Sequence, residues 1–137
     1  VTDDKETIEN MRLFGEKVGI AFQIKDDLFD YGKRKIGKPT GIDIKEKKMT
    51  LPLIYTLNNC SAKDKKYIIN SVKNHSNEKE RVQEIIEMVK DHGGIDYTIK
   101  EMNKVLKEGY DILESMGIDK SNPELKSLVQ YVIDREV

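Results

Sequence analysis

The sequence predicts an all-α protein, and three observations carry this prediction. Apolar residues recur at the 3.6-residue spacing of amphipathic helices, whereas the alternation of Val, Ile and Thr that marks strands never persists. Glycine and proline, which interrupt helices, occur at only a few places. The chain has 137 residues, which is a usual length for one domain. We therefore expect a helical bundle of about six helices.

The first predicted helix runs from about Thr7 to Tyr31. A basic loop from Gly32 to Gly41 follows, in which three glycines and a proline disfavour a helix. A second helix is expected from about Met49 to Leu57, with Pro52 in its first turn, where the missing N–H has no intrahelical partner.

Four further helices are expected, and each has a boundary signal. Their approximate ranges are 62–73, 78–91, 95–116 and 123–134. The signals are Ser61 as an N-cap, a turn at 74–77, the break at Gly93-Gly94, Gly117 as a helix end, and Pro123 near the first helical position.

The composition limits the function classes. Lys and Arg number 24 and Asp and Glu number 25, and this balance argues against general nucleic-acid binding. No apolar run approaches the ~18 residues of a membrane span, and no signal peptide is visible. The one cysteine, Cys60, precludes an intramolecular disulfide and fits a reducing, cytoplasmic location.

Four polar side chains share about a quarter of the circumference of the first helix, at ~100° per residue. With Asp26 at zero, Asp30 falls at about 40°. Gln23 then lies at about 60° and Asp27 at about 100°. Like charges at this spacing destabilise a helix by roughly 0.2–0.5 kcal/mol, and these lie at the end that the macrodipole disfavours. A divalent cation would offset the repulsion, and Mg²⁺ typically takes one or two carboxylates plus phosphate oxygens.

The simpler alternative is a solvated acidic face, and two observations weigh against it. Apolar residues flank the acids, which indicates a substantially buried helix. Gly15 and Gly19 fall within about 20° of Asp26 on the wheel. Glycine inside a helix costs about 1 kcal/mol relative to alanine, so two on one face indicate a close approach by a neighbouring helix or a ligand. Lys17 and Lys25 interrupt the apolar arc, and only snorkelling at its edge accounts for them.

Basic residues follow the acids within sixteen residues: Lys33, Arg34, Lys35, Lys38, Lys45, Lys47 and Lys48. Acids that hold a cation beside bases that hold an anion form the arrangement that a metal diphosphate needs. Lys33 to Lys35 are most simply a solvated loop. Lys38 differs, because Gly37, Pro39 and Gly41 shape the backbone around it.

Three linked motifs then resemble those of one family. The first is Phe22-Gln23-Ile24-Lys25-Asp26-Asp27-Leu28-Phe29-Asp30, which resembles the second aspartate-rich motif of trans-polyprenyl diphosphate synthases, F-Q-x-x-D-D-x-x-D. The second is Gly37-Lys38-Pro39-Thr40-Gly41-Ile42-Asp43, which is similar to G-K-x-x-G-x-D. The third is Glu46-Lys47-Lys48-Met49-Thr50-Leu51-Pro52-Leu53, which is similar to the K-x-T-L-P segment. The likeness is densest over residues 12–57 and leans toward the long-chain, octaprenyl-type branch.

The resemblance implies an isoprenoid-synthase-type helical bundle around a central cavity, usually a homodimer. It implies Mg²⁺-dependent head-to-tail condensation of an allylic diphosphate with isopentenyl diphosphate. By position, the resemblance assigns the metal to Asp26, Asp27 and Asp30. It assigns substrate binding to Gln23, Lys38, Lys48 and Asp43. Among these, the expected catalytic residues are Asp26, Lys38 and Gln23.

One departure is large, because the family's first aspartate-rich motif has no counterpart here. The other paired acids, Asp3-Asp4, lie in a polar stretch without that context. We therefore expect residues 1–137 to be the C-terminal fragment of a single polyprenyl synthase domain, without its N-terminal half, and to be inactive alone.

Three alternatives stay open. The chain could be a non-catalytic helical partner subunit of a prenyl synthase. It could be a terpene cyclase-like relative, although the G-K-x-x-G-x-D and T-L-P stretches argue against this. It could also be a helical interaction module with an acidic face.

Overall fold

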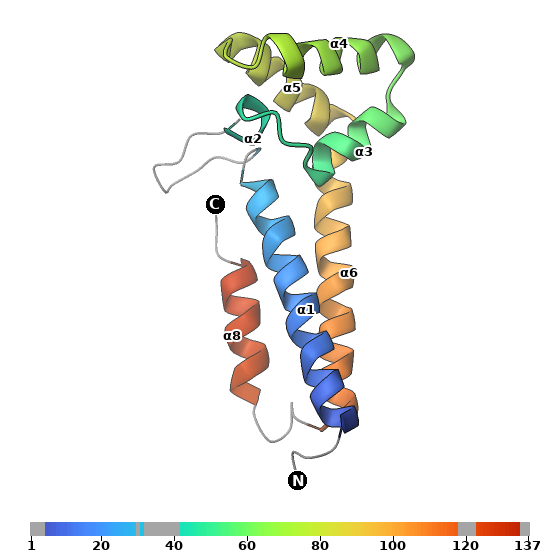
Figure 1. The fold of residues 1–137 in the computed structure, drawn as a ribbon, viewed down its shortest axis with the longest axis vertical. Coiled ribbons are helices and arrows are strands. Elements are labelled where there is room, and N and C mark those ends of the chain that lie inside the picture. The colour runs from blue at the N-terminus through green and yellow to red at the C-terminus, as the bar shows by residue number, and fades with distance from the viewer. Residues whose placement is uncertain (1–4, 30, 32–41, 118–122, 135–137) are drawn as a thin grey trace. The chain divides into compact units, whose positions relative to one another are not determined.

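The computed structural model describes residues 5–29, 31, 42–117 and 123–134 (Figure 1). Within these ranges the chain forms seven helices and no strand. The helices are α1 (Lys5–Leu28), α2 (Ile42–Lys45), α3 (Leu51–Asn59), α4 (Ala62–Asn74), α5 (Lys79–Asp91), α6 (Gly94–Ser115) and α8 (Pro123–Asp134). The all-α prediction is therefore confirmed. None of the described helices has an apolar stretch long enough to cross a membrane.

All six predicted helices are present, and their ends shift by a few residues. The first ends at Leu28 rather than Tyr31, because the Phe29 and Tyr31 N–H groups donate to the Asp26 and Leu28 carbonyls in a tightened last turn, each at 3.1 Å. Ser61 caps α4 as predicted, since its Oγ accepts a 3.1 Å hydrogen bond from the Asp64 N–H.

Two further features concern loops. Gly117 has a φ of +71°, so it ends α6 in the left-handed conformation expected of a C-terminal glycine. The four-residue helix α2 was not predicted. The predicted basic loop, Gly32 to Gly41, lies outside the described residues.

The chain divides into two compact units. The first comprises Val1–Lys25 and Lys100–Glu136, and the second comprises Asp26–Ile99 and Val137. Helices α1 and α6 therefore each contribute to both units.

In the first unit, α6 runs antiparallel to α1 and to α8 (Figure 1). Polar contacts join the helices: Lys17 Nζ lies 3.0 Å from Glu108 Oε1, and the Tyr110 hydroxyl donates to Gln130 Oε1 at 2.9 Å. The apolar core beneath them consists of Phe14, Ala21, Ile24, Met102, Leu106, Leu113, Val129 and Ile133.

In the second unit, α3, α4 and α5 pack on one another around a continuous core. This core contains Tyr31, Ile44, Leu53, Leu57, Ile68, Val72, Ile85, Ile86 and Val89. Full burial of a Leu, Ile or Val side chain contributes about 1.5–3 kcal/mol, so this cluster is the main stabilising term of the unit. Tyr31 and Ile44 anchor the segments that carry the predicted site residues to this core.

The start of α6 approaches α3 closely, and Gly94 makes this possible. A Cβ at Gly94 would lie 2.7 Å from the Pro52 carbonyl oxygen, 2.8 Å from Thr56 Oγ1 and 2.9 Å from Val89 Cγ1. One turn further on, the Tyr55 and Tyr97 rings stack with centroids 4.3 Å apart. The contact therefore requires a residue without a side chain.

We predict that Gly94→Ala lowers the free energy of unfolding by about 1–3 kcal/mol, because the added methyl meets backbone that cannot move aside. Urea denaturation followed by circular dichroism measures the change. The matched control is Gly15→Ala. A Cβ at Gly15 meets nothing within 4 Å, so this change is expected to raise stability by about 0.5–1 kcal/mol. Equal effects of the two substitutions would contradict the close-contact explanation.

Candidate functional site

Two of the three predicted metal-binding acids lie at the end of α1. Asp26 is exposed and Asp27 is half-buried, while Leu28 beside them is buried. Gln23 is exposed one turn earlier in the same helix. Asp30, the third acid, lies outside the described residues. The carboxylates of Asp26 and Asp27 thus stand on a helix end whose neighbouring apolar residue anchors it in the core.

The face of α1 that carries Asp26 is open within the described part of the chain. A Cβ built at Gly15 or Gly19 meets nothing within 4 Å. Phe22 on the same side is 37% exposed, whereas Ile24 and Leu28, which also flank the acids, are buried. The two glycines therefore provide room that no described residue fills.

A short helix and a capped turn position the Lys48 segment. The Lys47 N–H donates to the Ile44 carbonyl at 2.9 Å, and the Lys48 N–H donates to the Asp43 carbonyl at 2.8 Å. This pair of bonds is the Schellman motif, in which the residue after the helix takes a left-handed conformation and is usually glycine. Here that residue is Lys47, with a φ of +62°. The turn sets the direction in which Lys48 leaves α2.

Two carboxylates lie beside the Lys48 ammonium. Its Nζ lies 3.1 Å from Glu46 Oε2 and 3.7 Å from Asp43 Oδ1. The hydrogen bond that Lys48 donates to Glu46, the negative charge of Glu46 and the negative charge of Asp43 raise the pKa of Lys48. The ammonium therefore stays charged through neutral pH, and its favourable interaction is lost only as the pH rises through the raised pKa. The Lys48 side chain remains 62% exposed, so it can also reach a ligand in solvent.

Asp43 is more enclosed than Lys48. Its side chain is 14% exposed, and it lies on α2, where it faces Lys48. The resemblance assigns substrate binding to Asp43 and to Lys38, but Lys38 lies outside the described residues. Lys48 is one partner of Asp43, since its Nζ lies 3.7 Å from Asp43 Oδ1.

The donor chemistry of these residues fits Mg²⁺. Hard oxygen ligands suit this ion, which usually takes only one or two carboxylates and completes its shell with water and phosphate. Among the described residues, no group of three or more His, Cys, Asp or Glu is arranged to hold a metal. Asp26 and Asp27 are the described acids of the predicted metal-binding set, and carboxylates are ligands of the kind that Mg²⁺ takes.

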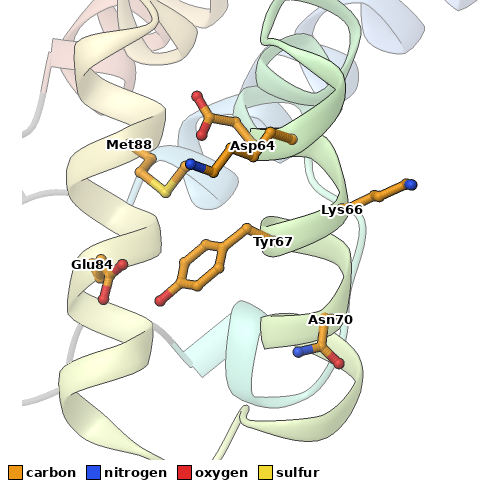
Figure 2. A pocket seen from close by; sticks show the side chains of 7 residues that line it. Asp64, Lys66, Tyr67, Asn70, Glu84 and Met88 are labelled. Carbon is orange, nitrogen blue, oxygen red and sulfur yellow. The ribbon is translucent and has the colours of Figure 1, made fainter.

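A separate hollow of about 650 Å³ lies between α4 and α5. Figure 2 shows Tyr67 reaching from α4 toward Glu84 on α5. The hydrogen bond with Glu84 raises the pKa of Tyr67. The other lining residues are Lys63, Asp64, Lys66, Asn70 and Met88, and none of the predicted site residues is among them.

The chain is similar in sequence to known proteins of one family. The sequence profile of the family described as polyprenyl synthetase matches residues 1–89. The chain is 32% identical to geranylgeranyl diphosphate synthase of Sulfolobus acidocaldarius, over 89% of this chain and 38% of that protein. It is 27% identical to heptaprenyl diphosphate synthase component 2 of Bacillus subtilis, over 97% of this chain and 38% of that protein.

A solved structure gives the same result. The fold matches the crystal structure of geranylgeranyl pyrophosphate synthase from Bacteroides thetaiotaomicron with a TM-score of 0.84 and 37% identity. The match covers 96% of this chain and 44% of that one. The chain therefore spans less than half the length of the relatives that it matches here.

We predict that Lys47→Gly raises the free energy of unfolding by up to about 1 kcal/mol, because glycine adopts a positive φ without the penalty that a Cβ brings. Thermal unfolding measures the change. Lys45→Gly is the control, since the same substitution at a helical position should cost about 1 kcal/mol. If both variants lose stability equally, the left-handed turn at Lys47 is not formed in solution.

Proposed function

The chain belongs to the polyprenyl synthetase family, and from this premise we propose that it supplies one side of the Mg²⁺–diphosphate site of a trans-polyprenyl diphosphate synthase. The reaction is head-to-tail condensation of an allylic diphosphate with isopentenyl diphosphate. The observation that supports this most is the order of three motifs, which runs from the α1 acids through residues 37–43 to Lys48 within a family match over residues 1–89.

The bond changes define what the site must do. The allylic carbon–oxygen bond breaks, and its electron pair leaves with the diphosphate. The double bond of isopentenyl diphosphate then forms the new carbon–carbon bond, and a proton is lost. Negative charge therefore builds on the departing diphosphate, and stabilising it electrostatically is the largest contribution that such a site can make.

The acids of α1 are proposed to hold the metal. Asp26, together with Asp30, would ligate Mg²⁺, and Asp27 would act through water or orient the other two. When bound, the ion supplies positive charge to the diphosphate oxygens as a Lewis acid. The exposed position of Asp26 at the end of α1 supports this role.

The basic residues are proposed to grip the diphosphate. Lys48 would move from Glu46 and Asp43 to a phosphate oxygen, which its exposed and fully charged ammonium allows. Asp43 would orient that lysine. Lys38 would contribute a second positive charge, and Gln23 would contact the substrate from α1.

We predict that the chain binds inorganic pyrophosphate only with Mg²⁺, and that Asp26→Asn weakens this binding by about 10–100-fold, because a charged ligand is lost. Isothermal titration calorimetry with and without EDTA measures both effects. Asp91→Asn removes an exposed acid at the end of α5 and should leave the affinity unchanged. Binding that ignores Mg²⁺, or that responds equally to the two variants, contradicts the proposed site.

We also predict no turnover by this chain alone, because it spans 38% of the curated synthases compared above and lacks a first aspartate-rich motif. Incubation with an allylic diphosphate and labelled isopentenyl diphosphate tests this, and product formation by the isolated chain would refute it. A polypeptide that contains this chain after a first aspartate-rich motif should be active. A parent reading frame without that motif would instead favour a non-catalytic partner subunit.

Three finer assignments rest on the resemblance and complete the proposal. The first places the full enzyme in the long-chain, octaprenyl-type branch of the family, and mass spectrometry of its product would test this. The full enzyme is a homodimer. It works in the reducing cytoplasm, where the single free thiol of Cys60 is compatible with its surroundings.

A further inference from the structure

One buried hydrogen bond joins the two segments that carry the proposed metal and diphosphate residues. The Tyr31 hydroxyl lies 3.1 Å from Thr50 Oγ1, and either hydroxyl can donate. The two residues are 3% and 5% exposed and stand 19 positions apart in the sequence. Tyr31 follows the aspartate-rich motif directly, and Thr50 lies two residues after Lys48.

Thr50 makes this bond in place of the usual local one. It is the N-cap of α3 in an extended conformation, with φ −88° and ψ 163°, where a threonine hydroxyl normally accepts from a backbone N–H of the first turn. Its side chain makes no such capping bond. Pro52 in that first turn has no N–H to donate. The hydroxyl of Thr50 therefore forms a hydrogen bond with a residue distant in the sequence and not with the first turn of its own helix.

Both ends of the connection are held by backbone hydrogen bonds. On the first side, the Phe29 and Tyr31 N–H groups bond to carbonyls of the last turn of α1, so Tyr31 is fixed relative to Asp26. On the second side, the Ile54 N–H donates to the Thr50 carbonyl at 2.9 Å. The ring of Tyr31 also belongs to the core of the second unit.

Only Met49 separates Lys48 from Thr50, and Lys48 is itself tied to α2 through the Asp43 carbonyl. A displacement of Thr50 relative to Tyr31 would therefore move the lysine relative to the acids of α1. A buried hydrogen bond between two packed segments resists such a displacement, because separating the two hydroxyls breaks a bond that a low-dielectric core strengthens.

We propose that Tyr31 and Thr50 are positioning residues that set the separation between the Asp26 and Asp27 carboxylates and the Lys48 ammonium. They touch neither metal nor diphosphate, and they act through the segments that they join. This role rests on the proposed function, since it matters only if these groups bind one Mg²⁺–diphosphate between them.

The test compares Tyr31→Phe, Thr50→Val and the double variant in the full chain, by calorimetric titration with Mg²⁺ and inorganic pyrophosphate and by thermal unfolding. Each single change should weaken binding by about tenfold, and the double change should weaken it no further, because the two hydroxyls act as one unit. The melting temperature should recover in the double variant, because replacing both partners of a buried hydrogen bond by apolar groups of the same shape is nearly neutral. Affinity that stays low while stability recovers is the signature of positioning.

Two controls separate this from a general loss of structure. Thr50→Ser keeps the hydroxyl and should bind like the unchanged chain. Tyr110→Phe removes another tyrosine hydrogen bond, to Gln130 in the first unit, and should not alter affinity. Affinity in the double variant equal to that of the unchanged chain would overturn the positioning role alone. Failure of the unchanged chain to bind Mg²⁺–pyrophosphate would reject the proposed site, and the positioning role with it.

Discussion

The candidate site depends on the closure of one chain segment, from Tyr31 to Thr50. Closing a loop of this length costs on the order of 2–3 kcal/mol in chain entropy. Tyr31 at one end and Ile44 within the segment are 3% and 1% exposed, and burial of such side chains contributes about 1.5–3 kcal/mol each. The two effects are of similar size, so the closed segment persists because both anchors reach the same core. Without that core, the acids of α1 and Lys48 would have no fixed relation.

The two segments differ in how their charges are placed. The acids of α1 are unfavourably placed, whereas Lys48 already has two carboxylates beside it. Asp26 and Asp27 are adjacent acids at a helix C-terminus, where the macrodipole is negative. Lys48 is held by Glu46 and Asp43, which keep it charged without placing it against the α1 acids. In the proposed function, a metal ion would relieve the first arrangement, and a diphosphate would give the lysine a stronger acceptor than a solvated carboxylate. A metal ion and a diphosphate bound together would therefore stabilise the acids of α1 and Lys48 at the same time.

The parts of the fold that were predictable are those with local signals. Helical periodicity located six helices, and Ser61, Gly117 and Pro123 marked ends that the structure confirms or places within a few residues. The helix α2 was not predicted, because four residues are too few to show a 3.6-residue period. The end of α2 was not predicted either, because Lys47 occupies the left-handed position where glycine is usual.

The parts that were not predictable depend on distant partners. Lys17 interrupted the apolar arc of the first helix, and its partner, Glu108, lies 91 positions away on α6. The bond between Tyr31 and Thr50 likewise joins residues with no local pattern to link them. Thr50 in particular resembles an ordinary N-cap in sequence, and only the structure shows that its hydroxyl serves another segment.

The helical glycines differ in whether a described residue packs against them. A helical glycine costs about 1 kcal/mol, so each one calls for a compensating close approach. At Gly94 the chain provides it, since Pro52, Thr56 and Val89 leave no room for a Cβ. At Gly15 and Gly19 no described residue comes within 4 Å. These two share a face with Asp26, so no described contact offsets the glycine cost on the side of α1 where the proposed function would place the substrate. A ligand that approached this face closely, as the proposed function requires, would account for both glycines.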